Sequence, residues 1–72
     1  MTPRTQRANA ALAEYCRVKG EALDCQETGI IDLMADLMHL AHDENLDGFD
    51  LSRIAQKHFL VELATGSKPE AR

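Results

Sequence analysis

The 72-residue chain has few aromatic residues and lacks a long apolar segment. Its aromatic residues are Tyr15, Phe49 and Phe59, and it has no Trp. Because a membrane-spanning helix needs about 20 predominantly apolar residues, the sequence predicts no membrane partner. The first residues are polar and no apolar segment follows them, so no secretory signal peptide is predicted and the expected compartment is the cytoplasm.

Motifs that carry chemistry are also missing. There is no Gly-rich loop of the kind that holds a phosphate group. No Ser or Cys has, at a recognisable spacing, the His and carboxylate that activate a nucleophile. The sequence therefore favours a non-enzymatic protein without a cofactor.

Basic residues are absent from the middle of the chain, although the net charge is only −4. Residues 1–20 carry a net charge of +3 and residues 51–72 a net charge of +2. Between them, residues 21–50 contain nine acidic residues: Glu21, Asp24, Glu27, Asp32, Asp36, Asp43, Glu44, Asp47 and Asp50. This pattern disfavours a nucleic-acid partner, because phosphates would be repelled. It predicts that a basic first helix lies beside an acidic second helix.

Helix-forming residues dominate, with plentiful Ala, Leu, Glu and Met and few β-branched residues. Residues typical of helix ends divide the chain: Thr2, Pro3, Gly20, Asp24, Glu27, Asn45, Asp47, Asp50 and Gly66. They predict an all-α three-helix bundle with helices near 3–19, 25–44 and 48–65. Asp47 and Asp50 remain alternative N-caps of the last helix. We expect one helical domain over residues 1–66 and a disordered tail over residues 67–72.

The apolar residues of the last two helices exceed what one chain of this length can cover. At 100° per residue, an arc of roughly 180° on the middle helix holds Ile30, Ile31, Leu33, Met34, Leu37, Met38, Leu40 and Ala41, whereas a surface helix needs only about 100°. In the last helix, Phe59, Leu60 and Leu63 point away from the face of Leu51 and Ile54. We therefore expect a homodimer or higher oligomer, with an interaction surface at Phe59, Leu60, Leu63, Met34 and Met38.

Four further residues carry separate expectations. Gly29, inside the middle helix, predicts a close helix crossing. His58 lies among apolar residues and is expected to be packed in a core. Cys16 and Cys25 are expected to be packed free thiols. Two alternatives stay open for them: an antiparallel hairpin that brings them together as a disulfide, and a reactive Cys25 near a helix N-terminus.

One group of residues has the spacing of a metal site. Asp32, Asp36 and His39 lie at i, i+4 and i+7, so that their side chains share one side of the middle helix. Carboxylate oxygens suit magnesium or manganese. The same spacing is typical of an acidic, solvated helix face. The sequence favours the solvated face and keeps a metal site as the alternative.

Three segments resemble a group of small bacterial all-α proteins of unknown function. They are D-L-M-A-D-L-M-H-L-A at residues 32–41, N-L-D-G-F-D at residues 45–50 and A-Q-K-H-F-L-V-E at residues 55–62. The resemblance covers a little under half the chain. It implies a small helical protein and no particular activity.

The acidic middle helix, followed by an L-D turn and another helix, also resembles the all-α MazG-type nucleotide pyrophosphohydrolases. Asp36 matches the Asp of that family's E-x-x-D motif, but Leu33 stands where the Glu belongs and Asp32 is one residue out of register. The upstream E-x-x-E pair is absent, since the first helix offers only Glu14. The resemblance therefore implies a related helical architecture without most of the magnesium ligands.

These observations lead to three hypotheses for function. The favoured one is a non-enzymatic interaction or accessory protein that acts as a homo-oligomer and meets a second copy or another protein. The first alternative is a metal-dependent nucleotide pyrophosphohydrolase that uses Asp32, Asp36 and His39. The second alternative is an acidic mimic of nucleic acid that blocks a DNA-binding protein.

Overall fold

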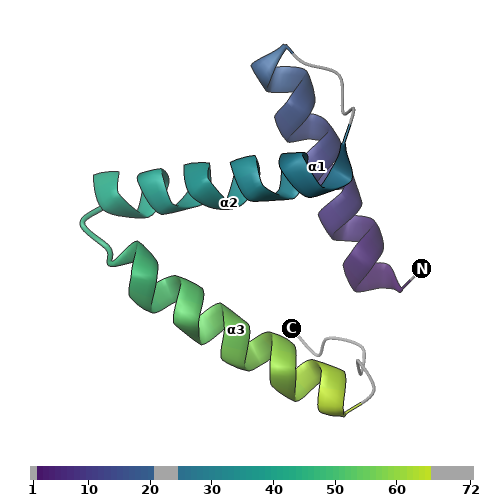
Figure 1. Cartoon of the computed structure of the whole chain (residues 1–72), viewed down its shortest axis with the longest axis vertical. Helices are drawn as coiled ribbons and strands as arrows, with labels where there is room; N and C mark the ends of the chain where they lie inside the picture. The colour runs from purple at the N-terminus through teal and green to yellow at the C-terminus, as the bar shows by residue number, and fades with distance from the viewer. Residues whose placement is uncertain (1, 21–24, 66–72) are drawn as a thin grey trace. The chain divides into compact units, whose positions relative to one another are not determined.

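The computed structural model of the protein describes residues 2–20 and 25–65, and within these ranges it contains three α-helices and no strand (Figure 1). The helices are α1 (Pro3–Lys19), α2 (Gln26–Asp43) and α3 (Gly48–Ala64). The predicted three-helix, all-α fold is confirmed, and each predicted helix end agrees to within a residue. The predicted cap at Asp24, the stop at Gly66 and the tail lie outside the described residues. No described helix is long and apolar enough to cross a membrane.

Helix α1 begins and ends at the residues that the sequence predicts. The side-chain oxygen of Thr2 accepts a hydrogen bond from the Thr5 backbone N–H at 3.1 Å, and Pro3 takes the first helical position. At the other end Gly20 adopts a left-handed φ of 79°, and its N–H donates to the Arg17 carbonyl oxygen at 3.1 Å. Because glycine has no Cβ, this conformation is accessible to it without strain.

Helix α2 ends in a backbone motif that turns the chain toward α3. Asn45 has a positive φ of 63°, and its N–H donates to the His42 carbonyl oxygen at 3.1 Å. The Leu46 N–H reaches back to the Ala41 carbonyl oxygen at 2.8 Å. These two bonds form a Schellman motif, which satisfies carbonyl groups that the helix itself leaves without partners. The helix end that the sequence predicts at Asn45 is confirmed.

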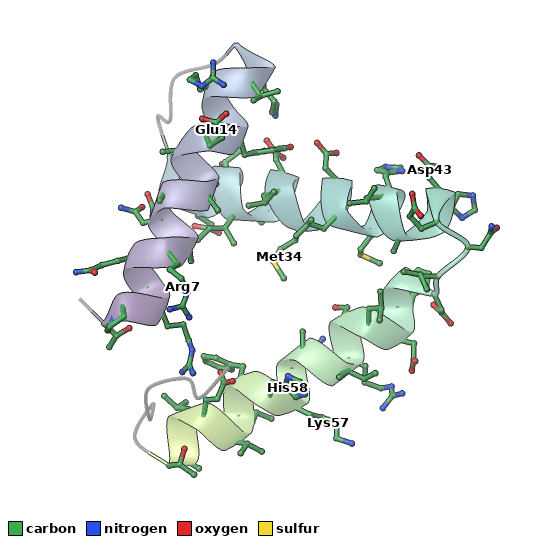
Figure 2. The ribbon with its side chains drawn as sticks, turned by 180° about the vertical axis from the view of Figure 1, so that it is seen from behind. Arg7, Glu14, Met34, Asp43, Lys57 and His58 are labelled. Atoms are coloured by element: carbon green, nitrogen blue, oxygen red, sulfur yellow. The ribbon has the colours of Figure 1, made fainter. Side chains whose placement is uncertain are left out.

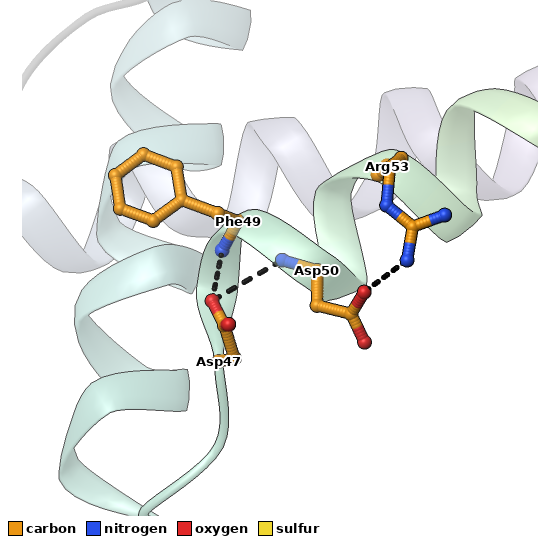
Figure 3. A network of polar contacts seen from close by, with 4 residues as sticks. All are labelled: Asp47, Phe49, Asp50 and Arg53. Atoms are coloured by element: carbon orange, nitrogen blue, oxygen red, sulfur yellow. Dashed lines mark hydrogen bonds and ion pairs between the residues drawn. The ribbon is translucent and has the colours of Figure 1, made fainter.

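Asp47, rather than Asp50, is the N-cap of α3. Its side chain accepts from the Phe49 N–H at 3.0 Å and from the Asp50 N–H at 3.2 Å (Figure 3). Asp50 lies within the first turn of the helix and pairs with Arg53. The cap position belongs to Asp47 because its extended backbone turns its side chain onto the free N–H groups of the first turn.

The chain divides into two compact units, Met1–Ala35 and Asp36–Arg72, which we call the N-terminal and the C-terminal unit. Helix α2 belongs to both. In the N-terminal unit, Leu12, Cys16 and Gly29 are buried. In the described part of the C-terminal unit, Ala41 is the only buried residue.

In the N-terminal unit α1 crosses the start of α2. The Gln26 amide lies 3.3 Å from the Asn9 side-chain oxygen, and Lys19 Nζ lies 3.4 Å from Asp32 Oδ2. The later residue on α1 thus meets the later residue on α2, which is the opposite of the order in an antiparallel hairpin. Gly29 is buried between these two contacts, where the helices cross, as the sequence predicts.

In the C-terminal unit the end of α2 and the start of α3 approach each other closely. A Cβ added to Gly48 would lie 3.2 Å from the Met38 Cβ and 3.4 Å from the Met38 Cα and carbonyl oxygen. These atoms belong to the rigid part of α2 and not to a flexible side-chain tip. The close approach therefore depends on glycine at the first position of α3.

Candidate functional site

The described residues expose many large hydrophobic side chains. Within residues 2–20 and 25–65, only three apolar side chains are buried: Leu12, Cys16 and Ala41. The same ranges contain fourteen exposed large hydrophobic residues: Val18, Ile30, Ile31, Met34, Leu37, Leu40, Leu46, Phe49, Leu51, Ile54, Phe59, Leu60, Val61 and Leu63. Single exposed hydrophobic residues are normal on soluble proteins, but a surplus of this size is typical of interaction surfaces.

The exposed hydrophobic residues are unevenly distributed between the two units. Four of them belong to the N-terminal unit: Val18, Ile30, Ile31 and Met34. The other ten belong to the C-terminal unit, and seven of those lie on α3. The candidate interaction surface is therefore concentrated in the C-terminal unit.

Of the five residues predicted to form an interaction surface, four are exposed. Phe59, Leu60 and Leu63 are between 59% and 60% exposed, and Met34 is 56% exposed. Met38 differs because it is half-buried and lies against Gly48 at the α2–α3 corner. Its role in the C-terminal unit is to pack against α3.

Phe49 belongs to the same surface but was missed by the sequence analysis. It is 80% exposed, the highest value among the large hydrophobic residues. The angle of 100° per residue places it within an arc of about 100° that also holds Phe59, Leu60 and Leu63. We call these four residues the Phe49 stripe. Phe49 follows the turn directly, so from the sequence it resembles a turn residue more than a helical residue.

A second set of apolar residues occupies another side of α3. Leu51, Ile54 and Val61 fall within about 80° of one another, and we call them the Leu51 stripe. His58 lies within the same arc, where its side chain projects from α3 and is exposed (Figure 2). The prediction that His58 is packed in a core is therefore wrong. The reason is that no described helix of the C-terminal unit covers this side of α3 at that level.

The acidic residues of α2 are placed as the sequence predicts, but they form no compact cluster. Asp43 lies on the last turn of α2 (Figure 2), and Asp36 and His39 are exposed on the same helix. Asp32 is paired with Lys19. Within residues 2–20 and 25–65, no group of three or more His, Cys, Asp or Glu is placed to hold a metal ion. The metal site at Asp32, Asp36 and His39 stays a prediction, which a thermal melt with magnesium or manganese tests.

The predicted contact between a basic α1 and an acidic α2 includes the ion pair of Lys19 with Asp32. Lys19 reaches Asp32 while its Nζ lies 5.2 Å from the centre of the Tyr15 ring. Arg17 instead pairs with Glu14 of its own helix at 2.5 Å. This pair lowers the pKa of Glu14 and raises that of Arg17. Exposed ion pairs of this kind stabilise a fold only weakly.

The two thiols are free but occupy different environments. Cys16 is buried on α1 and Cys25 is exposed immediately before α2. The prediction that both thiols are free is confirmed, but the prediction that Cys25 is packed is wrong, because its side chain is exposed. Hydrogen bonds from the Thr28 backbone N–H, and then from the Thr28 hydroxyl and the Glu27 backbone N–H, lower the pKa of the Cys25 thiol. Free N–H groups at a helix start stabilise a thiolate in this way.

Comparison with known proteins returns no relative for this chain. No family model matches it, no curated protein matches it and no solved structure matches it. The resemblances to small bacterial all-α proteins and to MazG-type hydrolases therefore stay predictions from the sequence.

Proposed function

We propose that the protein is a small, non-enzymatic interaction protein that acts as a homo-oligomer. The observation that supports this proposal is the imbalance between three buried and fourteen exposed hydrophobic residues within the described part of the chain. A domain of this size is only marginally stable even when its core is well formed, because little of its surface is removed from water. A second subunit supplies the missing burial.

The amount of exposed apolar surface suits such an association. At about 25 cal/mol per Å², the usual burial free energy of a large apolar side chain corresponds to about 60–120 Å². With roughly half of each side chain exposed, fourteen residues present on the order of 700 Å² of apolar surface to water. A standard protein–protein interface removes about 800 Å² from each partner. The chain therefore has enough exposed apolar surface for a specific interface.

Light scattering and thermal melts over a range of protein concentrations test the proposal. We expect a dimer or higher oligomer, and a melting temperature that rises with protein concentration, because association stabilises the folded state by mass action. A monomer that keeps the same melting temperature between about 1 and 100 µM would overturn the proposal.

A further inference from the structure

The exposed end of α3 is apolar on nearly every side. Phe59, Leu60, Val61 and Leu63 are all between 59% and 61% exposed. At 100° per residue they spread over about 200° of the helix circumference. One neighbouring helix covers a stripe of only about 100°. This end of α3 therefore needs two neighbours, and the C-terminal unit contains one other helical segment, the end of α2.

Helix α1 has few exposed apolar residues and so offers little surface for self-association. The large apolar residues of α1 are Leu12, Tyr15, Cys16 and Val18. Leu12 and Cys16 are already buried in the N-terminal unit, and Tyr15 is half-buried. Val18 alone remains fully available, against seven exposed hydrophobic residues on α3.

The three helices also differ in net charge, which affects whether two copies can meet through them. From the residues within their bounds, α1 carries a net charge of +3 and α2 a net charge of −4. Helix α3 carries two acidic and two basic residues, so its net charge is zero, and its Arg53 and Asp50 pair with each other. Two copies that meet through α1 or α2 repel each other, whereas two copies that meet through α3 do not.

We propose that a second copy of the chain docks on the C-terminal unit, with the Phe49 stripe of α3 at the centre of a twofold interface. The inference rests on the proposed self-association and names its surface. Each α3 then has two helical neighbours, the end of α2 in its own copy and α3 of the second copy. The four residues of the Phe49 stripe present on the order of 250 Å² of apolar surface, which suits the apolar centre of a standard interface.

The aromatic residues of the wild-type chain allow a direct test by NMR. Both Phe residues lie on α3 in the Phe49 stripe, and the only Tyr lies on α1. In an equal mixture of isotope-labelled and unlabelled protein, filtered NOE spectra report contacts between copies alone. We expect intermolecular NOEs from the Phe49 and Phe59 rings to methyl groups of the second copy, and none from Tyr15.

The same spectra distinguish failure of this inference from failure of the proposed function. Intermolecular NOEs at Tyr15 with none at either Phe ring would show that the copies meet elsewhere, while self-association stands. A monomer by light scattering, with no intermolecular NOE at any ring, would overturn both.

A matched pair of variants provides an independent measurement. Leu60→Lys places a charge in the Phe49 stripe, and Val18→Lys places the same charge on α1 at a residue that is 69% exposed. We expect L60K to raise the dissociation constant about tenfold or more and V18K to change it less than about twofold. Equal effects of the two variants, or a larger effect of V18K, would overturn the inference. If L60K does not fold, the wild-type NOE spectra decide the question.

Discussion

The two units of the chain are stabilised by different kinds of interaction. The N-terminal unit buries Leu12, Cys16 and Gly29 at a helix crossing, and side-chain contacts flank that crossing on either side. The C-terminal unit has a well-defined corner with a Schellman motif and the Asp47 cap, but among its described residues only Ala41 is buried. Hydrogen bonds close in sequence are thus enough to form a sharp turn between helices. They do not provide a core, and the ten exposed hydrophobic residues of this unit are the result.

The largest expected effect on stability is the truncation of a buried side chain in the N-terminal unit. The same truncation of an exposed side chain in the C-terminal unit is the comparison. Leu12→Ala should lower the free energy of unfolding by about 3 kcal/mol, because it leaves a cavity beside a side chain that is 3% exposed. Leu60→Ala should have little effect in dilute solution, because the side chain is exposed within its own copy. Urea unfolding followed by circular dichroism measures both.

Protein concentration sharpens this first prediction. The loss of unfolding free energy caused by L12A should be present at every protein concentration. The loss caused by L60A should grow as the protein is concentrated, because the second copy then binds. If L60A is as harmful as L12A in dilute solution, then Leu60 is buried within the single chain and the difference between the units disappears.

The next effect concerns the close approach at the α2–α3 corner. Gly48→Ala should lower the free energy of unfolding by about 1.5 kcal/mol, since overpacking against Met38 outweighs the better helix propensity of Ala. Gly20→Asn is the matched control. Nothing lies within 4 Å of a Cβ at Gly20, and Asn tolerates a left-handed backbone, so its unfolding free energy should change little. A neutral or stabilising G48A would show that α2 and α3 are free to separate at the corner.

Removal of the α3 cap should have a smaller effect. Asp47→Ala leaves the Phe49 and Asp50 N–H groups without their side-chain acceptor and should lower the free energy of unfolding by about 1 kcal/mol. Asp47→Asn keeps an acceptor oxygen and should lose only a fraction of that value. Chemical unfolding of the three proteins side by side gives the comparison. Equal losses for both variants would mean that the charge of Asp47, and not its hydrogen bonds, supports the turn.

The smallest effect on stability, but a clear chemical difference, is expected at the two thiols. The lowered pKa of Cys25 increases its thiolate fraction at a given pH, so its alkylation should become fast at a lower pH than that of an ordinary cysteine. Cys16 is buried and should react only when the N-terminal unit opens. Mass spectrometry of iodoacetamide-treated protein across a pH series measures both rates. Rapid labelling of Cys16 under native conditions would contradict the burial that distinguishes the N-terminal unit.

Much of the fold was predictable, because the residues that begin and end helices act over a few positions. Thr2, Gly20 and Asn45 take the roles that their side chains or backbone preferences favour. The choice between Asp47 and Asp50 was not predictable, because both are good N-caps and only the backbone conformation separates them.

The candidate site was predictable in part. Phe59, Leu60 and Leu63 stood out because they lie on a different side of the helix from the Leu51 stripe. The position of His58 is not predictable in this way, because the apolar face on which it lies is left uncovered in the structure. Phe49 was overlooked because helical periodicity is hard to recognise in the first turn.

The sequence by itself determined that this chain is helical and where its described helices begin and end, since these features depend on residues within one or two turns of each other. The tertiary structure alone decided which surfaces are covered. It turned α1 across α2 at Gly29, buried Cys16 and exposed Cys25. It also left α3 with two uncovered apolar stripes. The physical reason is that burial depends on neighbours distant in sequence, and the periodicity of one helix does not show which neighbours it meets.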